Sequence, residues 1–245
     1  MKRCINSSFT DIYFHLAAEE YLLKQGMEDV FMLWQDTPSV VLGKHQRVLS
    51  EVNQDWVEQQ GIPVARRFSG GGTVYHDLGN VNLTFIETTA RLPDFTIYLQ
   101  RTLNFLASVG LSAEGDERLG IYLNGLKISG SAQCVYKNRV LYHCTLLYDT
   151  DLDRLNKAIN PVKEQERLGS REQKMVPTVY AVPSVRSEVT NVRMYLPLSI
   201  AQFKKRIFEF FSGQQTISSF DEGELKAIRQ LKDEKYSQPA WIYSR

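Results

Sequence analysis

The feature of the 245-residue sequence that most constrains its fold is a run of three glycines between two strand-like segments. The run lies in Arg66-Arg67-Phe68-Ser69-Gly70-Gly71-Gly72. Glycine loses more conformational freedom on folding than any other residue, so such a run indicates a tight turn or a close approach of the backbone to another group. With two guanidiniums beside it, the loop's N–H groups would suit an anionic ligand. A hairpin turn whose arginines face solvent is the alternative interpretation.

The spacing of apolar residues elsewhere predicts a mixture of helices and strands in a single domain. Helical spacing is found at 8–25, 50–60, 95–109, 152–159, 199–212 and 221–235. The charged segment 163–175 is expected to be a mobile loop or a fraying helix.

Two regions carry hairpin signals. The β-rich segments 31–35 and 39–43 flank Asp36-Thr37-Pro38, which predicts a hairpin-like pair. A β-meander is predicted at 118–148. Its first turn, Asn124-Gly125, is a strong hairpin signal because both residues tolerate positive φ.

Composition argues against several classes of protein. The 29 basic and 28 acidic side chains leave a net charge of +1, so no long-range attraction would hold a nucleic acid or a membrane surface. No segment approaches the length of a membrane span, and no signal peptide is evident. The 3 cysteines have no paired spacing, which is typical of a reducing compartment without structural zinc. We therefore expect a cytoplasmic protein.

Two further groups of residues could carry chemistry. His76, followed by Asp77, could donate a hydrogen bond to a ligand, although a histidine satisfied within a turn is the simpler interpretation. Lys127 precedes the small residues of Ile128-Ser129-Gly130-Ser131-Ala132. Its ammonium could stabilise negative charge on a phosphate or carboxylate, whereas most strand lysines simply face solvent.

Taken together, the motifs resemble those of the lipoate–protein ligase A family, within the biotin/lipoate protein ligase superfamily. The resemblance is carried by RRFSGGGTVYHDLGNVNLTFI and LNGLKISGSAQ, and extends to DIYFHLAAEEYLL, HCTLLYDTDL, SVRSEVTN and KYSQPAWIYSR. It implies an α/β (α+β) catalytic domain over 1–245, with a mixed, mostly antiparallel sheet flanked by helices. No C-terminal accessory domain is expected in this chain, so a separate accessory subunit could supply it.

The resemblance also implies a reaction. ATP and Mg2+ would activate lipoate or octanoate as an acyl-adenylate. The acyl group would then pass to a lysine of a lipoyl domain, either of a 2-oxoacid dehydrogenase complex or of the glycine cleavage H protein. Lys127 would be the catalytic residue. The residues implied in substrate binding are Arg67, Ser69, Gly70, Gly71, Gly72, His76, Asn80, Ser131 and Ala132.

The sequence departs from the family pattern at three places. Where related ligases carry Arg-Asn-Asp, in which the Asp helps to hold magnesium and phosphate, this chain has Arg118-Leu119-Gly120. Asp116 or Glu117 could substitute only if the loop shifts, which leaves the metal ligands unknown. His15 stands where the family often has Asn, and Cys144 stands where Gly is usual.

These departures keep two alternatives open. The first is an octanoyl or lipoyl transferase that works through a cysteine thioester, for which Cys144 beside His143 is the candidate. Strand alternation would, however, direct those two side chains to opposite faces. The second alternative is a non-catalytic relative that binds lipoate without activating it. A biotin ligase is a poorer match, because the loop continues into Val-Tyr-His-Asp-Leu-Gly-Asn rather than a basic pattern.

Overall fold

A six-stranded sheet forms the centre of the computed structural model, which describes residues 2–90, 93–161, 182–213, 215 and 217–244. Its strands, in spatial order, are β10 (Ser131–Tyr136), β11 (Arg139–Leu147), β6 (Asn80–Thr88), β2 (Asp29–Trp34), β1 (Lys2–Asn6) and β12 (Ile217–Ser218). The first four strands pair antiparallel, and β1 pairs parallel with both β2 and β12. The predicted mixed, mostly antiparallel sheet is confirmed.

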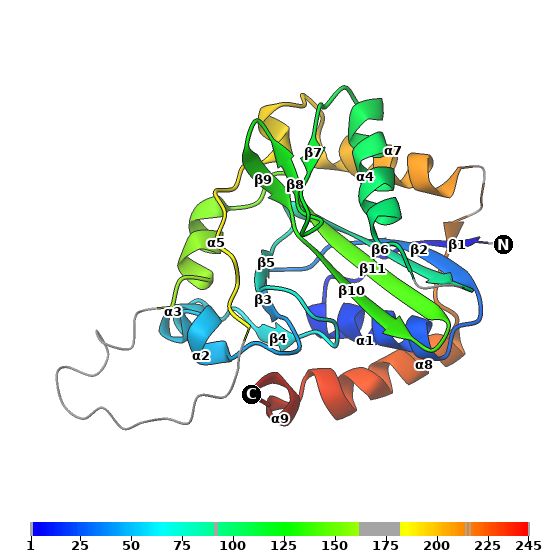
Figure 1. The fold of residues 1–245 in the computed structure, drawn as a ribbon. Helices are drawn as coiled ribbons and strands as arrows, with labels where there is room; N and C mark the ends of the chain where they lie inside the picture. The colour runs from blue at the N-terminus through cyan, green and yellow to red at the C-terminus, as the bar shows by residue number, and fades with distance from the viewer. Residues whose placement is uncertain (1, 91–92, 162–181, 214, 216, 245) are drawn as a thin grey trace.

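Two layers of helices cover the faces of this sheet (Figure 1). One face packs against α1 (Ile12–Lys24) and α8 (Glu222–Leu231), and the other against α4 (Thr96–Ser108) and α7 (Ile200–Ser212). Each face therefore has its own apolar core. Asp11, Ser199 and Asp221 cap the N-termini of α1, α7 and α8 through their side chains. The helices predicted at these positions are confirmed to within a few residues.

The chain also forms two small sheets that are separate from the central one. The first contains β4 (Val64–Arg66), β3 (Ser39–Leu42) and β5 (Val74–His76), and the second contains β7 (Glu114–Gly115), β8 (Ile121–Leu123) and β9 (Leu126–Ser129). The predicted hairpin of 31–35 with 39–43 is wrong, because β2 lies in the central sheet and β3 in the first small sheet. Asp36, between the two strands, is fully buried and hydrogen-bonded to two histidines. The segment around it therefore connects one sheet to another and does not form a hairpin turn.

The remaining elements are short. The predicted helix at 50–60 is two helices, α2 (Val48–Glu51) and α3 (Gln54–Gln59), because Val52 is extended. The helix α5 (Leu152–Ala158) follows β11, and the chain ends in a π-helical turn (Lys232–Tyr236) and α9 (Pro239–Ile242).

The predicted meander at 118–148 is split, since β8 and β9 pair in the small sheet while β10 and β11 pair in the central one. Its first turn is confirmed, with φ of 50° at Asn124 and 78° at Gly125. Segment 163–175 lies outside the described residues. Within the described part of the chain, no helix is both long enough and apolar enough to cross a bilayer.

Candidate active site

A cavity of about 1080 Å³ lies between the β4-β3-β5 sheet, the strands β9 to β11 and the segment 182–189. Leu16, Trp34, Val41 and Val74 form an apolar part of its wall. The polar part includes Arg67, His76, Lys127, Ser131 and His143. The cavity therefore brings together residues that are widely separated along the chain.

Arg67 holds the glycine loop in place. It is 4% exposed, and its guanidinium donates hydrogen bonds to the carbonyls of Gly70 (2.6 Å), Gly72 (2.6 Å) and Val41 (3.2 Å). Burial lowers the pKa of Arg67 to about 10. Arg66 is likewise buried, so a hairpin turn with solvent-facing arginines is excluded.

Close backbone approach explains some of the glycines and not others. A Cβ on Gly43 would lie 2.1 Å from the carbonyl oxygen of Gly71. Gly71 has a φ of 84°, and a Cβ there would lie 2.8 Å from Arg67 Nη2 and 3.2 Å from Ala132 Cβ. A Cβ on Gly70 would meet no described atom within 4 Å. The need for a residue without a Cβ thus falls on Gly71, and on Gly43 outside the run, rather than on every glycine of the run.

A chain of buried hydrogen bonds lies behind the loop. Ser69 Oγ lies 3.0 Å from His143 Nε2, and His143 Nδ1 lies 2.9 Å from Glu19 Oε1. Glu19 Oε1 also accepts a hydrogen bond of 2.6 Å from Thr84 Oγ1. Glu19 and His143 were not among the predicted site residues. Glu19 could have been suspected as a charged residue on the apolar side of the predicted helix 8–25.

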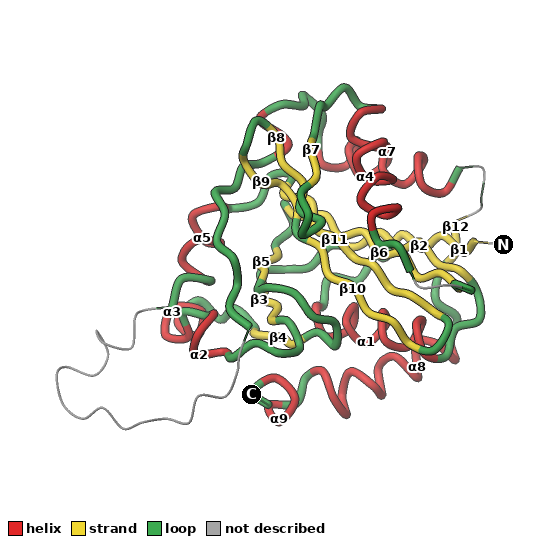
Figure 2. The backbone as a smooth tube through the Cα atoms, in the orientation of Figure 1, coloured by secondary structure: helices red, strands yellow, loops and turns green. Residues whose placement is uncertain are grey.

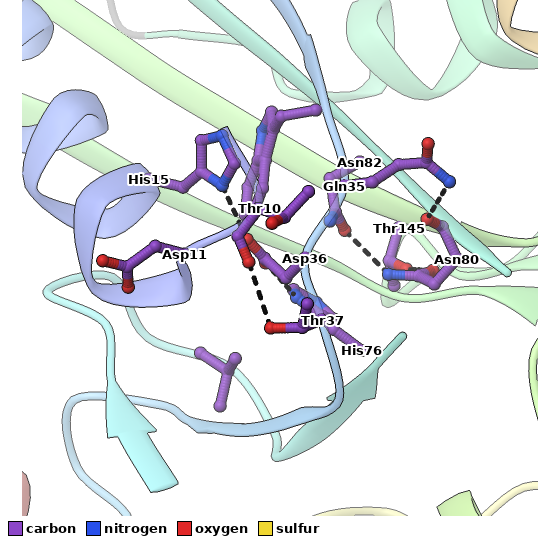
Figure 3. A network of polar contacts seen from close by, with 12 residues as sticks. Thr10, Asp11, His15, Gln35, Asp36, Thr37, His76, Asn80, Asn82 and Thr145 are labelled. Atoms are coloured by element: carbon purple, nitrogen blue, oxygen red, sulfur yellow. Dashed lines mark hydrogen bonds and ion pairs between the residues drawn. The ribbon is translucent and has the colours of Figure 1, made fainter. Parts of the chain in front are cut away.

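A second buried network lies around Asp36 (Figure 3). His15 Nδ1 lies 2.6 Å from Asp36 Oδ1, and His76 Nδ1 lies 3.0 Å from Asp36 Oδ2. Burial favours a raised pKa for Asp36, but the charges and hydrogen bonds of His15 and His76 outweigh it, so the pKa is lowered. The ring of Trp34 lies 4.6 Å from that of His15 and 5.7 Å from that of His76. His76 therefore enters the cavity wall in a fixed orientation.

Asn80, predicted as a substrate-binding residue, lies beside the cavity rather than in its wall. It is fully buried, donates a hydrogen bond of 3.0 Å to Asn82 Oδ1 and accepts another from Thr145 Oγ1 (Figure 3). Asn82 and Thr145 do line the cavity. Ser69 and Gly70 are also outside the lining, whereas their neighbours Gly71 and Gly72 are part of it.

Lys127 lies on β9 and is half-buried. Its backbone N–H donates to Glu188 O (2.8 Å), and its carbonyl accepts from Thr190 N (3.0 Å). Burial lowers the pKa of the Lys127 ammonium, an effect that Asp116 opposes and Arg118 reinforces. Ser131 and Ala132, in the adjoining β10, line the same cavity.

The segment 182–189 joins the two halves of the cavity wall, and Figure 2 shows that it contains no helix and almost no strand. At one end, Ser184 Oγ accepts hydrogen bonds of 2.9 Å from Thr73 N and from Gln46 Nε2. At the other end lie the backbone bonds to Lys127. The sequence motif SVRSEVTN is thus part of the site, although no residue of it was predicted there.

Comparisons with known proteins identify the family. The chain matches the model of the lipoyl protein ligase A/B catalytic domain over residues 11–212. It is 34% identical over 255 residues to lipoate–protein ligase 1 of Staphylococcus aureus, covering 100% of this chain and 74% of that protein. The chain belongs to this family.

Other relatives agree with this assignment. Lipoate-protein ligase LplJ of Bacillus subtilis is 31% identical over 251 residues, covering 98% of this chain and 72% of that protein. Among solved structures, lipoate-protein ligase A bound with ATP gives a TM-score of 0.81 at 25% identity, covering 99% of this chain and 98% of that one. A Thermoplasma acidophilum protein with bound lipoic acid has the same fold, with a TM-score of 0.81 at 24% identity and 100% coverage of both chains.

A transferase of this family would need a cysteine that forms a thioester with the acyl group, and Cys144 is poorly suited to that role. It is 3% exposed and packs in the core beneath α4 and α7, and burial raises the pKa of its thiol to about 12. A nucleophilic cysteine needs a lowered pKa. His143 points to the opposite face, toward Glu19, as the alternation along β11 predicts. Burial also raises the pKa of Cys134.

Proposed function

We propose that the protein is a lipoate–protein ligase that activates lipoate, or octanoate, with ATP and transfers the acyl group to a lysine of a lipoyl domain. The observation that carries this proposal is the single cavity in which an apolar wall, the glycine loop and Lys127 meet. Trp34, Val41 and Leu16 suit an aliphatic tail. Lys127 supplies the positive charge that a carboxylate and a phosphate both require.

The chemistry follows in two steps. In the first, a carboxylate oxygen of the acid bonds to the α-phosphorus of ATP, and pyrophosphate leaves. In the second, the acceptor lysine amine bonds to the acyl carbon, loses a proton, and AMP leaves. Both steps develop negative charge on oxygen, which the Lys127 ammonium and the loop N–H groups would stabilise. The remaining contribution of the site is to hold the reacting groups together.

The residues predicted to bind substrate fall into two groups, those that line the cavity and those that lie behind its wall. Arg67, Gly71, Gly72, His76, Ser131 and Ala132 line the cavity and would contact the acyl-adenylate directly. Ser69, Gly70 and Asn80 would act by holding those residues in place. All these assignments follow from the family resemblance together with the cavity geometry.

Magnesium would be needed with ATP. A magnesium ion keeps phosphate and water ligands, so a protein needs to supply only one or two carboxylates. Among the described residues, no three His, Cys, Asp or Glu side chains form a group that could hold a metal ion alone. Asp116, whose charge acts on Lys127, is the carboxylate that fits such a role.

The acceptor would be a lipoyl domain. The archaeal relative with a TM-score of 0.81 and 26% identity is described as a bipartite ligase with its E2 lipoyl domain. Lipoyl domains of 2-oxoacid dehydrogenase complexes and the glycine cleavage H protein are the acceptors to test first. A second polypeptide could be required, as in that bipartite system.

The test is an intact-mass assay with lipoate, ATP, Mg2+ and an unmodified lipoyl domain. We expect an ATP-dependent lipoyl increment on the domain. Lys127→Ala should reduce its formation by at least about 100-fold, because a charge-assisted contact in the transition state is lost. Lys205→Ala, which changes a lysine whose side chain is 75% exposed, is the matched control. Lipoyl-AMP without transfer would indicate a missing accessory subunit, whereas bound lipoate without any adenylate would favour the non-catalytic alternative.

A further inference from the structure

Gln46, which follows β3, has a buried side-chain amide that is bonded to separate segments of the chain. The residue is 1% exposed. Its Oε1 accepts hydrogen bonds from Gly43 N (3.0 Å) and Thr73 Oγ1 (2.8 Å), and its Nε2 donates to Ser184 Oγ (2.9 Å). One side chain therefore joins the turn after β3, the end of the glycine loop and the segment 182–189.

These contacts use the whole hydrogen-bonding capacity of the Gln46 amide. A glutamine side chain offers two N–H donors and two acceptor lone pairs. The second N–H of Gln46 donates to Val182 O (3.3 Å), so all four positions are filled. The orientation of the amide is fixed as well, because the Gly43 N–H can only donate and the Val182 carbonyl can only accept. The partners of Gln46 therefore lock its side chain, and the locked side chain holds them at fixed separations.

The segment 182–189 is held against the glycine loop at Ser184. Ser184 Oγ accepts a hydrogen bond from Thr73 N (2.9 Å), and Ser184 N donates to Glu51 Oε1 (3.0 Å). A Cβ on Gly72 would lie 3.1 Å from Ser184 Oγ, so the loop and the segment approach closely. The junction between them is therefore a bonded contact on both sides of Ser184.

The polar part of the cavity depends on this junction. Thr73, at the end of the glycine loop, and Arg186, in the segment 182–189, both line the cavity. Further along the same segment, Glu188 O accepts a hydrogen bond of 2.8 Å from Lys127 N. The separation of the loop and the segment therefore sets the shape of the polar part, whereas the apolar wall comes from α1, β2, β3 and β5.

We infer that Gln46 is a positioning residue, which sets the separation of the glycine loop and the segment 182–189 and thereby the binding of the phosphate-bearing substrate. This inference rests on the proposed function, in which the polar part of the cavity takes ATP and the apolar wall takes the acyl tail. Loss of the amide would release the segment at Ser184, while the backbone bonds to Lys127 would keep its other end in place. ATP binding should then weaken more than lipoate binding, because the released segment must be ordered again before it contacts the nucleotide.

The first test needs no ligand. Gln46→Met removes all four hydrogen bonds of the amide at nearly constant side-chain volume. Hydrogen–deuterium exchange then reports how often the amides of Thr73 and Ser184 open. Each should exchange roughly fivefold to tenfold faster than in the wild type, since hydrogen bonds that hold the junction are lost. The amide of Lys127, bonded to the far end of the segment, should keep its wild-type rate.

Gln35→Leu is the matched control. Gln35 is also buried, and its amide joins Leu78 O to Lys204 Nζ. This variant shows whether loss of any buried glutamine amide would speed exchange at the junction. Equal acceleration in Gln35→Leu and Gln46→Met would overturn the inference, as would wild-type exchange in Gln46→Met.

A second substitution keeps the inference testable if Gln46→Met does not fold. Ser184→Ala removes only the hydroxyl oxygen that accepts from Gln46 Nε2 and Thr73 N. It should speed exchange of the Thr73 amide by a similar factor. Where both single variants fold, the double variant should exchange no faster than Gln46→Met, because both substitutions break the same junction. Fully additive effects would overturn the inference.

Ligand titrations complete the test. In Gln46→Met, we expect the affinity for ATP with Mg2+ to fall at least about tenfold, and the affinity for lipoate to change less than about threefold. An equal loss of both affinities would overturn the inference, because a general structural defect would weaken both ligands alike. The exchange comparison needs no ligand, so it decides the role of Gln46 at the junction even if the proposed function fails.

Discussion

His143 Nδ1 lies 2.9 Å from Glu19 Oε1, which joins the central strand β11 to helix α1 through two buried ionisable side chains. Glu19 is fully buried, so its carboxylate depends on His143 and Thr84 for its hydrogen bonds. His143 also lies in the cavity wall. The same pair therefore supports the fold and shapes the site.

Removing the histidine should be costly for stability. His143→Ala leaves the Glu19 carboxylate buried without its main partner, and we expect the free energy of unfolding to fall by about 3 kcal/mol. Urea denaturation measures this. His45→Ala, at an exposed position, should change the value by less than about 0.5 kcal/mol. Equal effects of the two substitutions would show that the buried pair contributes nothing specific.

Two glycine substitutions should behave oppositely. Gly43→Ala places a Cβ 2.1 Å from Gly71 O, so the backbone of the glycine loop must move. We expect a loss of about 2 kcal/mol and weaker lipoate binding. Gly70→Ala meets no described atom within 4 Å, and Gly70 does not have a positive φ, so stability and binding should stay near wild type. Calorimetric melting and lipoate titration of both variants provide the comparison, and a strong defect in Gly70→Ala alone would contradict it.

Acid should weaken the attachment of the C-terminal turn to α1. Glu20 accepts hydrogen bonds from Lys235 Nζ (2.6 Å) and Tyr236 OH (2.5 Å). Burial favours a raised pKa for Glu20, but Lys235, Lys24 and Tyr236 lower it below its ordinary 4.5. A lowered folded-state pKa means that the ionised carboxylate contributes its full stability above pH 4.5 and loses it as the pH falls through the lowered value.

We therefore expect Glu20→Gln to be less stable than the wild type at pH 7, with the difference shrinking at pH 3. Denaturant unfolding at the two pH values measures this difference. Glu222→Gln, at an exposed position on α8, serves as the control. A difference that does not depend on pH would rule out a contribution from the charge of Glu20.

The turn between β10 and β11 contains a strained lysine. Lys137 is exposed and has a φ of 53°, a conformation that Asn tolerates far better than Lys or Ala. Lys137→Asn should be more stable than Lys137→Ala by about 1 kcal/mol, although both remove the same charge. Thermal melting of the two variants measures the gain, and equal melting temperatures would contradict it.

Local signals predicted much of the fold. The helices that begin after Asp11, Ser199 and Asp221 and the Asn124-Gly125 turn depend on residues close in sequence, and each is found close to where it was expected. The hairpin between 31–35 and 39–43 failed because a short polar connection does not reveal whether the next strand joins the same sheet. That choice depends on Asp36, whose partners His15 and His76 are 21 and 40 residues away.

The candidate site shows the same limit. The motifs brought Lys127, Arg67 and the glycine run to attention, and the structure gathers them around one cavity. The burial of Arg67 was not predictable, because one of the carbonyls that accept its hydrogen bonds belongs to Val41, 26 residues earlier. The turn from Asp116 to Gly120 contains Leu119 at a φ of 60°, which no local preference of leucine indicates.

The contacts between Arg66 and the last helix can form only late in the synthesis of the chain. Its Nε donates to Ile242 O, 176 residues further along the chain, and its own carbonyl accepts from Trp241 Nε1. At about 5 to 20 residues per second, a ribosome needs roughly 10 to 35 s to make that intervening length. During this time the guanidinium beside the glycine loop lacks that final acceptor. A nascent chain therefore cannot make this contact, which ties the segment before the glycine loop to the last helix, until Ile242 in α9 has been synthesised.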